Sequence, residues 1–251
     1  MRRLFARGLR VALGIAVLAA VGAAAERDAL DIAVVTDSRG APGPVMMKQD
    51  IKLKEGGVLP YDKLWPVAVS KIEGVKLSSA TGWRRLQTLS EIPPYLIRED
   101  KVYDVLIIQC GYDEYYRPEE NKKRMEGRVA GGDIEERFVD DLKERDYEVR
   151  GSKLEKYTFE TIRKYAKKVV YITINLGDFE ADQRENERFK QLGVFDYMIE
   201  LPLDPEWAPT KTVDGAHYNA DGHAYVAEKV IALIKKIMAE PAERPAESPS
   251  P

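Results

Sequence analysis

The chain has 251 residues, of which 44% are hydrophobic and 32% are charged, so it can bury the core of one substantial globular domain. Its formal net charge of −3, with both signs interspersed, does not favour a nucleic acid as partner. Its one cysteine, Cys110, excludes an intramolecular disulfide and a multi-cysteine metal site. Cys110 ends the apolar run 105–110, which predicts a buried thiol.

The first 25 residues have the composition of a secretory signal peptide. Four arginines precede an apolar run at 11–21, and small residues follow at 22–25. This pattern predicts cleavage after Ala25 and a periplasmic or secreted protein. The apolar run is short for a membrane span, which favours cleavage over a retained anchor and predicts no stable membrane insertion of the mature chain.

Residues 26–239 form the predicted domain, and residues 240–251 form a proline-rich polar tail that cannot bury a core. In the domain, short apolar runs alternate with amphipathic stretches. The runs are nearly continuous, as in strands buried on both faces of a parallel sheet. Their alternation with helical patterns predicts a three-layer α/β/α sandwich. Strands are predicted at 31–35, 75–79, 102–109, 168–174 and 195–201, and helices at 61–72, 83–89, 155–167, 182–192 and 219–238.

Two segments lie outside this alternation. Residues 39–60 connect the first strand to the first helix, and residues 117–150 carry 20 charged residues among 34. The second segment is interpreted either as a solvated helical excursion or as a cap that selects the substrate. Both segments follow the C-terminal ends of strands, where open α/β sheets bind their ligands.

Three residues form a candidate nucleophile system. Ser38 follows the first predicted strand, and Asp214 and His217 stand three residues apart just before the last helix. At that spacing one turn can present the carboxylate to the imidazole Nδ1–H, which leaves Nε2 free to take the serine proton. A serine nucleophile, a histidine base and an orienting aspartate are the parts of a covalent hydrolytic mechanism.

Asn219 and Gly222 open the last predicted helix. Asn219 is a predicted N-cap, and Gly222 is a predicted position of close packing in the first helical turn. A fixed helix start would also fix the loop that carries His217.

The ordered set of motifs resembles the SGNH/GDSL hydrolase superfamily of esterases, lipases and carbohydrate acyl-modifying enzymes. The Gly-Asp-Ser block of that family is similar to residues 36–38, its glycine after the second strand is similar to Gly82, and its Gly-x-Asn-Asp block is similar to residues 111–114. Its Asp-x-x-His block resembles residues 214–217. The four blocks occur in the family's order and span about residues 31–238.

This resemblance implies a flavodoxin-like sheet of five parallel strands and a reaction without a cofactor or a metal. It implies Ser38 as nucleophile, His217 as general base and Asp214 as the residue that orients the base. The implied oxyanion hole consists of the backbone N–H groups of Ser38 and Gly82 and a side-chain donor from the third block, which is Asp113 in this chain.

Two positions depart from the family pattern. Thr36 replaces a glycine at a strand end, where a β-branched residue fits. Asp113 replaces an asparagine, and an ionised carboxylate cannot donate a hydrogen bond to an oxyanion. Asp113 is therefore expected to be protonated by burial, to turn away, or to leave the enzyme slow or inactive.

The residues and the resemblance together predict an exported serine esterase or acyl hydrolase. Export favours a small-molecule or glycan ester of the cell envelope as substrate, and a transferase that passes the acyl group to a sugar would use the same three residues. Tyr112 and Tyr115 follow the third predicted strand, where a sugar ring can stack on them.

Two alternatives belong to other functional classes. A non-catalytic protein of this fold would bind a glycan or an acylated ligand; Asp113 favours this reading, and the intact serine, aspartate and histidine oppose it. A zinc site would draw on Asp214, His217, Asp221 and His223. His217 precedes the last helix and His223 lies inside it, so their side chains are expected to point apart.

Overall fold

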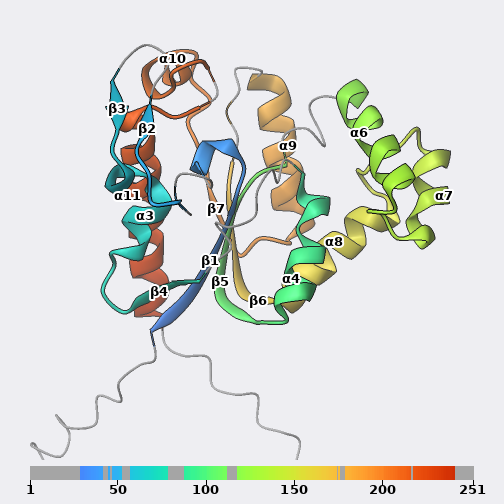
Figure 1. Ribbon diagram of the computed structural model, residues 1–251, viewed down its shortest axis with the longest axis horizontal. Helices are drawn as coiled ribbons and strands as arrows, with labels where there is room; N and C mark the ends of the chain where they lie inside the picture. The colour runs from blue at the N-terminus through green and yellow to red at the C-terminus, as the bar shows by residue number, and fades with distance from the viewer. Residues whose placement is uncertain are drawn as a thin grey trace, which may run out of the picture.

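The computed structural model describes residues 29–41, 45, 47–52, 57–78, 88–111, 118–173, 175, 179–215 and 217–240. Its centre is a sheet of five parallel strands between two layers of helices (Figure 1). All five predicted strands are confirmed, with ends displaced by two residues or fewer. They are β1 (Leu30–Thr36), β4 (Val75–Ser78), β5 (Tyr103–Gln109), β6 (Ala166–Ile172) and β7 (Tyr197–Ile199).

The strand order across this sheet is β4-β1-β5-β6-β7. When the five strands are counted along the chain, the order reads 2-1-3-4-5, which is the flavodoxin-like arrangement. The predicted α/β/α fold with a flavodoxin-like sheet is therefore confirmed. The order reverses between β1 and β5, because the chain first moves from β1 out to β4 and then returns to the other side of β1.

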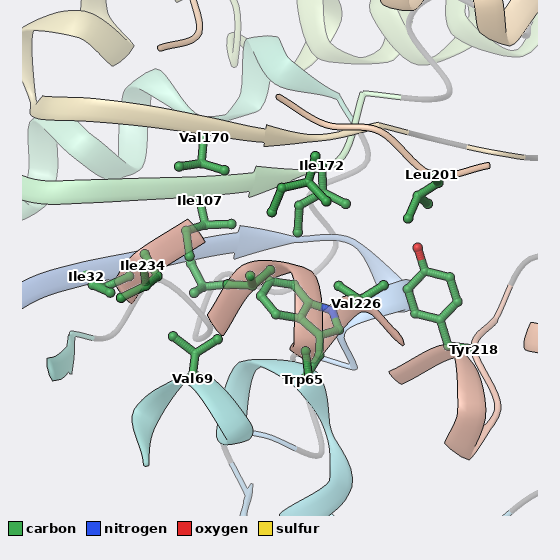
Figure 2. Packing of buried hydrophobic residues seen from close by; sticks show 14 of the residues in the cluster. Ile32, Trp65, Val69, Ile107, Val170, Ile172, Leu201, Tyr218, Val226 and Ile234 are labelled. Carbon is green, nitrogen blue, oxygen red and sulfur yellow. The ribbon is translucent and has the colours of Figure 1, made fainter. Parts of the chain in front are cut away.

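One face of the sheet is covered by α3 (Trp65–Ser70) and α11 (Ala220–Ala239) (Figure 1). Alternate side chains of β1, β5 and β6 point to this face, and Figure 2 shows Trp65 and Val69 packed against them. Trp65 is fully buried. Strand and helix residues of this core include Ile32, Val34, Val105, Ile107, Val170, Ile172, Val226, Val230 and Ile234.

Three helices cover the opposite face: α4 (Pro93–Glu99), α8 (Lys153–Lys164) and α9 (Phe179–Leu192). The remaining strand side chains pack here against an aromatic cluster. Tyr171 stacks on Phe195, and Phe189 meets both rings edge-on. Cys110 is fully buried on this face, which confirms the predicted buried thiol.

The predicted helix at 61–72 is divided into two pieces. The 3-10 turn η2 (Tyr61–Lys63) comes first, Leu64 is extended with φ −64° and ψ 132°, and α3 then begins. Pro66 has no N–H and is tolerated only in the first turn of a helix, so the helix starts beside it. The division is a consequence of this one proline.

Short elements have no counterpart in the prediction, because they span too few residues to show a periodicity. The predicted helix 83–89 lies mostly outside the described residues, and its end is the 3-10 turn η4 (Leu89–Glu91). The unpredicted elements are the 3-10 turn η1 (Ser38–Gly40), α4, α10 (Trp207–Lys211) and the hairpin of β2 (Ile51–Lys52) and β3 (Val58–Leu59).

The charged segment 117–150 contains α6 (Pro118–Gly131) and α7 (Glu136–Glu144), so its helical interpretation is confirmed. Its inner face is buried rather than solvated, because apolar side chains recur among the charges at helical spacing. This separate small core contains Met125, Ile134, Phe138, Leu142, Val149 and Leu154.

Two arginines connect α6 to η4. Arg124 forms an ion pair with Glu91, and Arg128 Nη1 donates to Ser90 Oγ at 3.0 Å. In Figure 1, α6 and α7 lie beside α8 and α9, and α9 separates them in that view from the turn that follows β1. The two helices therefore lie at the side of the sheet and do not extend over the end of β1.

All described strands and helices, from β1 to α11, fall within the predicted domain 26–239. The predicted signal peptide at 1–25 lies outside the described residues, and so does the predicted tail apart from Glu240. Across the described ranges, none of the helices combines the length and the apolar character that a membrane crossing requires.

A buried histidine joins α11 to α3. His223 lies in the first turn of α11 with 2% of its surface exposed, and its Nδ1 accepts the Trp65 backbone N–H at 3.3 Å. Burial lowers the pKa of His223 from 6.5 to about 4, because a charged imidazolium is poorly solvated there. Protonation of Nδ1 would also remove the acceptor of this hydrogen bond. The neutral ring is therefore a structural part of the helix packing.

We predict that protonation of His223 destabilises the protein in acid. The unfolded chain binds this proton below a pH of 6.5, whereas the folded chain binds it only below about 4. The stabilisation from the neutral ring is therefore fully present above pH 6.5 and is lost as the pH falls from 6.5 to about 4. Below pH 4 the free energy of unfolding is lower by about 3 kcal/mol. Urea unfolding of the wild type and of His223→Gln between pH 7 and pH 4 measures this loss. An equally steep loss in the variant would assign the acid sensitivity to other groups.

Candidate active site

The end of β1 lies where the strand order of the sheet reverses. The chain leaves β1 toward the face covered by α3 and leaves β5 toward the face covered by α8, so the two connections part at this edge. The Asp37 N–H donates to the Gln109 carbonyl at 3.0 Å, which extends the pairing of the two strands by one residue. Ser38 follows at once, and it stands where open α/β sheets bind their ligands.

Ser38 begins a 3-10 turn, η1, whose backbone is fixed on both sides of the serine. The Asp37 carboxylate caps the turn and accepts the Arg39 backbone N–H at 3.0 Å. Ala41 ends the turn with a left-handed backbone of φ 51°, and its N–H donates to the Ser38 carbonyl at 3.0 Å. Short-range hydrogen bonds therefore determine the direction in which Ser38 points.

Thr36 and Gly40 fit together at the base of this turn. A Cβ atom added to Gly40 would lie 2.3 Å from the Thr36 side chain, well inside contact distance. The residue at position 40 must therefore be glycine while position 36 carries a threonine. The absence of a side chain at Gly40 thus accommodates the departure from the family pattern at Thr36.

His217 lies in a tight loop between α10 and α11. The loop is closed by an antiparallel bridge between Thr212 and Tyr218 and by a hydrogen bond of 2.8 Å from the Val213 N–H to the His217 carbonyl. Gly215 adopts a φ of 85°, a conformation that residues with a side chain rarely adopt. The loop is thus a compact turn rather than a long excursion.

The start of α11 holds this loop in place. Asn219 Oδ1 accepts the Gly222 N–H at 2.9 Å, which confirms the predicted N-cap. The Asn219 backbone N–H donates to the Lys211 carbonyl at 3.0 Å. A Cβ atom on Gly222 would lie 2.1 Å from the same carbonyl oxygen, which confirms the predicted close-packing position.

The structure brings the three candidate catalytic residues together. His217 Nδ1 lies 2.7 Å from Asp214 Oδ2, and His217 Nε2 lies 3.0 Å from Ser38 Oγ. The second carboxylate oxygen of Asp214 accepts the His217 backbone N–H at 2.8 Å. A carboxylate only accepts, so Nδ1 carries the imidazole proton and Nε2 presents its lone pair to the serine hydroxyl. This arrangement can remove the Ser38 proton while Oγ attacks a carbonyl carbon.

These three residues stand at the protein surface. Ser38 is exposed, and the side chains of His217 and Asp214 are 49% and 38% exposed. Water and salt screen the attraction between the carboxylate and the imidazole, so the contact orients the ring and contributes little to stability. An exposed nucleophile can be reached by an ester group on a large molecule as well as on a small one.

A buried polar cluster lies behind the exposed residues. Gln109 Nε2 donates to the Tyr218 hydroxyl at 2.7 Å, and both side chains are buried. Burial raises the pKa of Tyr218, so its hydroxyl stays neutral. Arg39, also buried, pairs with Asp37. These residues are not among the predicted site residues, although a glutamine at the end of an apolar strand and an arginine beside Ser38 are the signals that could reveal the cluster.

Four predicted site residues lie outside the described residues: Gly82, Tyr112, Asp113 and Tyr115. They belong to the segments after β4 and β5, whose parallel strands end at the same edge of the sheet as β1. Of the predicted oxyanion hole, the structure therefore describes the backbone N–H of Ser38 alone.

The two histidines have different partners. His217 contacts Asp214 and Ser38, whereas His223 accepts a hydrogen bond from the backbone of Trp65. The two side chains thus point apart, as expected, and a zinc site built on both would require both rings to turn. Within the described part of the chain, no group of three or more His, Cys, Asp or Glu side chains is arranged to hold a metal ion.

Comparisons with known proteins show similarity in structure but not in sequence. No protein-family model matches the chain, and no curated protein sequence matches it. The psychrotrophic esterase EstA from Pseudoalteromonas sp. aligns with 84% of this chain and 100% of its own, at 12% identity and a TM-score of 0.50. A variant of Axe2, an acetyl-xylooligosaccharide esterase from Geobacillus, aligns with 86% of this chain and 96% of its own, at 11% identity and a TM-score of 0.48.

A GDSL-like protein from Bacteroides ovatus aligns with 83% of this chain at 16% identity and a TM-score of 0.44, and this chain spans 53% of that protein, about half its length. The alignment with EstA covers the whole of that esterase at a TM-score of 0.50. This chain therefore has the SGNH hydrolase fold. At such identities the likeness concerns the fold, and the chemistry has to be argued from the residues of the site.

We predict that Gly40→Ala destabilises the protein by about 1–3 kcal/mol, because its Cβ collides with Thr36. The loss in the double variant Thr36→Gly/Gly40→Ala should be smaller than the sum of the two single losses by at least half of the Gly40→Ala loss, since the colliding side chain is gone. A double-mutant cycle on the free energies of unfolding of the four proteins measures the coupling. Strictly additive losses would show that the two positions do not share this contact.

Proposed function

We propose that this protein is an exported serine esterase or acyl hydrolase that uses Ser38, His217 and Asp214. The observation that carries the proposal is the series of contacts from Asp214 Oδ2 to His217 Nδ1 at 2.7 Å and from His217 Nε2 to Ser38 Oγ at 3.0 Å. All three side chains are exposed, so their meeting contributes little to the stability of the fold. Since stability does not account for these contacts, we take catalysis by the three side chains as the explanation of their geometry.

In the first half of the proposed reaction, Ser38 Oγ attacks the carbonyl carbon of an ester while its proton moves to His217 Nε2. The carbonyl electron pair moves to the oxygen and forms a negatively charged tetrahedral intermediate. When this intermediate collapses, the bond to the alkoxy oxygen breaks, and the leaving alcohol takes the proton from Nε2. Ser38 then carries the acyl group as an ester.

In the second half, a water molecule attacks the acyl carbon and gives its proton to His217 Nε2. Collapse of the second intermediate returns that proton to Ser38 Oγ and releases the carboxylic acid. A sugar hydroxyl in place of water would lead to acyl transfer by the same steps. Asp214 stays ionised throughout and stabilises the imidazolium that forms twice in the cycle.

The proposed oxyanion hole uses the backbone N–H groups of Ser38 and Gly82. The third position belongs to Asp113, which can donate only as a neutral acid. Loss of one such donor lowers the rate by on the order of 10²–10³-fold in a serine hydrolase. We therefore expect slower turnover than with three donors unless Asp113 is protonated.

For the substrate we propose an ester-linked acyl group on a glycan or another polar molecule of the cell envelope. The predicted signal peptide supports this class, because it directs the chain to the compartment where such esters occur. The exposure of Ser38 supports it too, since an acyl group on a bulky polar molecule can reach an exposed hydroxyl. Tyr112 and Tyr115 would stack on sugar rings beside the site.

Removal of the catalytic side chains is expected to abolish activity without unfolding the protein. Ser38→Ala and His217→Asn should each lower kcat/KM for p-nitrophenyl acetate by about 10³-fold or more, and Asp214→Asn by on the order of 10²–10⁴-fold. A fluorophosphonate probe should label Ser38 in the wild type, and peptide mass spectrometry locates the adduct.

Asp221→Asn serves as the matched control, because Asp221 is an exposed carboxylate seven residues after Asp214. It should leave activity and labelling unchanged. A folded wild type that neither hydrolyses acetyl esters nor forms the adduct would overturn the esterase proposal and favour the glycan-binding alternative. Titration calorimetry with acetylated glycans would then test that alternative.

Asp113→Asn is expected to raise kcat by about 10-fold or more, because an amide N–H replaces a carboxylate that repels the oxyanion. Steady-state kinetics of the two proteins at pH 7 make the comparison, with Asp221→Asn again as control. An unchanged or lower rate would show that Asp113 does not repel the oxyanion, because it either donates as a neutral acid or points away from the site.

A further inference from the structure

Arg39 follows the candidate nucleophile directly, yet only 5% of its surface is exposed. Guanidinium groups are almost never buried in folded proteins without a partner. The partner here is Asp37: its Oδ1 accepts from Arg39 Nε at 2.9 Å, and its Oδ2 forms an ion pair with Nη2. The Arg39 side chain therefore folds back into the protein instead of extending into solvent.

The Asp37 carboxylate depends on this partner. It is 8% exposed and belongs to the residue immediately before Ser38. Without a cation it would place a desolvated negative charge close to the point where the substrate oxygen becomes negative. Burial opposes the charge on Arg39, but the Asp37 carboxylate more than compensates and raises the pKa of Arg39 above its ordinary value. The guanidinium stays charged, and the pair as a whole is neutral.

The same carboxylate shapes the turn around the nucleophile. Asp37 Oδ1 accepts both the backbone N–H of Arg39, at 3.0 Å, and the side-chain Nε of Arg39. The residues before and after Ser38 are thus tied to each other by their side chains as well as by the backbone. Both are buried while Ser38 is exposed, so the pair presents the serine hydroxyl outward.

Arg39 also influences Tyr218, the buried residue that follows His217 in the histidine loop. Its charge acts on the buried Tyr218 hydroxyl, where burial raises the pKa of Tyr218 and the guanidinium opposes that rise. Tyr218 is the next residue after His217, and Gln109 donates a hydrogen bond to it at 2.7 Å. The charge of Arg39 therefore acts on a residue of the histidine loop as well as on the serine turn.

We propose that Arg39 is a positioning residue for the reaction of Ser38. It neutralises the Asp37 carboxylate and holds the turn in the geometry that places Ser38 Oγ against His217 Nε2. The proposal rests on the esterase function proposed above. Arg39 does not touch the substrate and acts through Asp37 and the backbone of the turn.

Arg39→Met tests this role because it keeps the length of the side chain and removes the charge. We expect kcat for p-nitrophenyl acetate to fall by about 10²-fold while KM changes by less than about threefold, since the contacts with bound substrate are unaltered. Arg39→Lys keeps the charge but lacks the planar guanidinium that binds both oxygens of Asp37. Its kcat should lie between those of the wild type and Arg39→Met. Thermal unfolding of each variant establishes that it is folded.

The double variant Asp37→Asn/Arg39→Met separates the electrostatic effect from loss of structure. It leaves no uncompensated carboxylate, so it should be more stable than Arg39→Met and should recover at least about 10-fold of the lost kcat. A double variant that is folded and recovers nothing would contradict the neutralising role.

Arg188→Met is the matched control. Arg188 is a largely buried arginine on α9 that forms ion pairs with Glu155 and Glu185, on the far side of the sheet from α3 and α11. Its removal should lower stability and leave kcat unchanged. If folded Arg39→Met loses no more activity than Arg188→Met, the positioning proposal is wrong.

A second measurement does not depend on turnover. If the wild type neither hydrolyses acetyl esters nor reacts with the fluorophosphonate probe, the esterase proposal fails. The effect of Arg39 on the contact between Ser38 and His217 can still be tested by nitrogen NMR of the His217 ring, whose resonances are assigned with His217→Asn. The His217 Nε2 resonance should shift in Arg39→Met, as its contact with Ser38 Oγ is lost, and stay in place in Arg188→Met. An unchanged resonance in Arg39→Met would overturn the proposal.

Discussion

The parallel pairing of β1 with β5 is the constraint on which the site depends, because it fixes the place where the chain turns out of the sheet. The pairing continues one residue past β1, through the hydrogen bond from the Asp37 N–H to the Gln109 carbonyl. The same glutamine then holds Tyr218 with its side chain, beside His217. One strand end thus contacts the serine turn through its backbone and the histidine loop through its side chain.

The site has an exposed layer and a buried layer, and they differ in what they contribute. Ser38, His217 and Asp214 are exposed and make contacts that water screens, so they add little to stability. The polar side chains behind them are desolvated, and removing the partner of one of them would be costly. The buried layer therefore supplies the rigidity that lets three surface side chains hold one geometry.

Much of the fold and part of the site could be predicted from the sequence, because some structural features depend only on residues that are neighbours in the chain. Nearly continuous apolar runs identified all five strands, since a strand buried on both faces needs apolar residues at every position. Asn219 and Gly222 were interpretable for the same reason: an N-cap and a close approach are properties of a few neighbouring residues. The spacing of Asp214 and His217 likewise allowed both to lie on one turn.

Other features depend on contacts between segments far apart in the chain, which the sequence could suggest but could not establish. The contact of Ser38 with His217 joins positions 179 residues apart and exists only because the strand order brings both loops to one edge of the sheet. The buried pairing of Asp37 with Arg39 is local in sequence, yet whether an arginine turns inward or outward depends on what surrounds it. The sequence by itself determined the strands, the helix cap and which three residues are the candidates for catalysis. Only the tertiary structure decided which polar side chains are buried and paired, because burial is set by the packing of the whole chain.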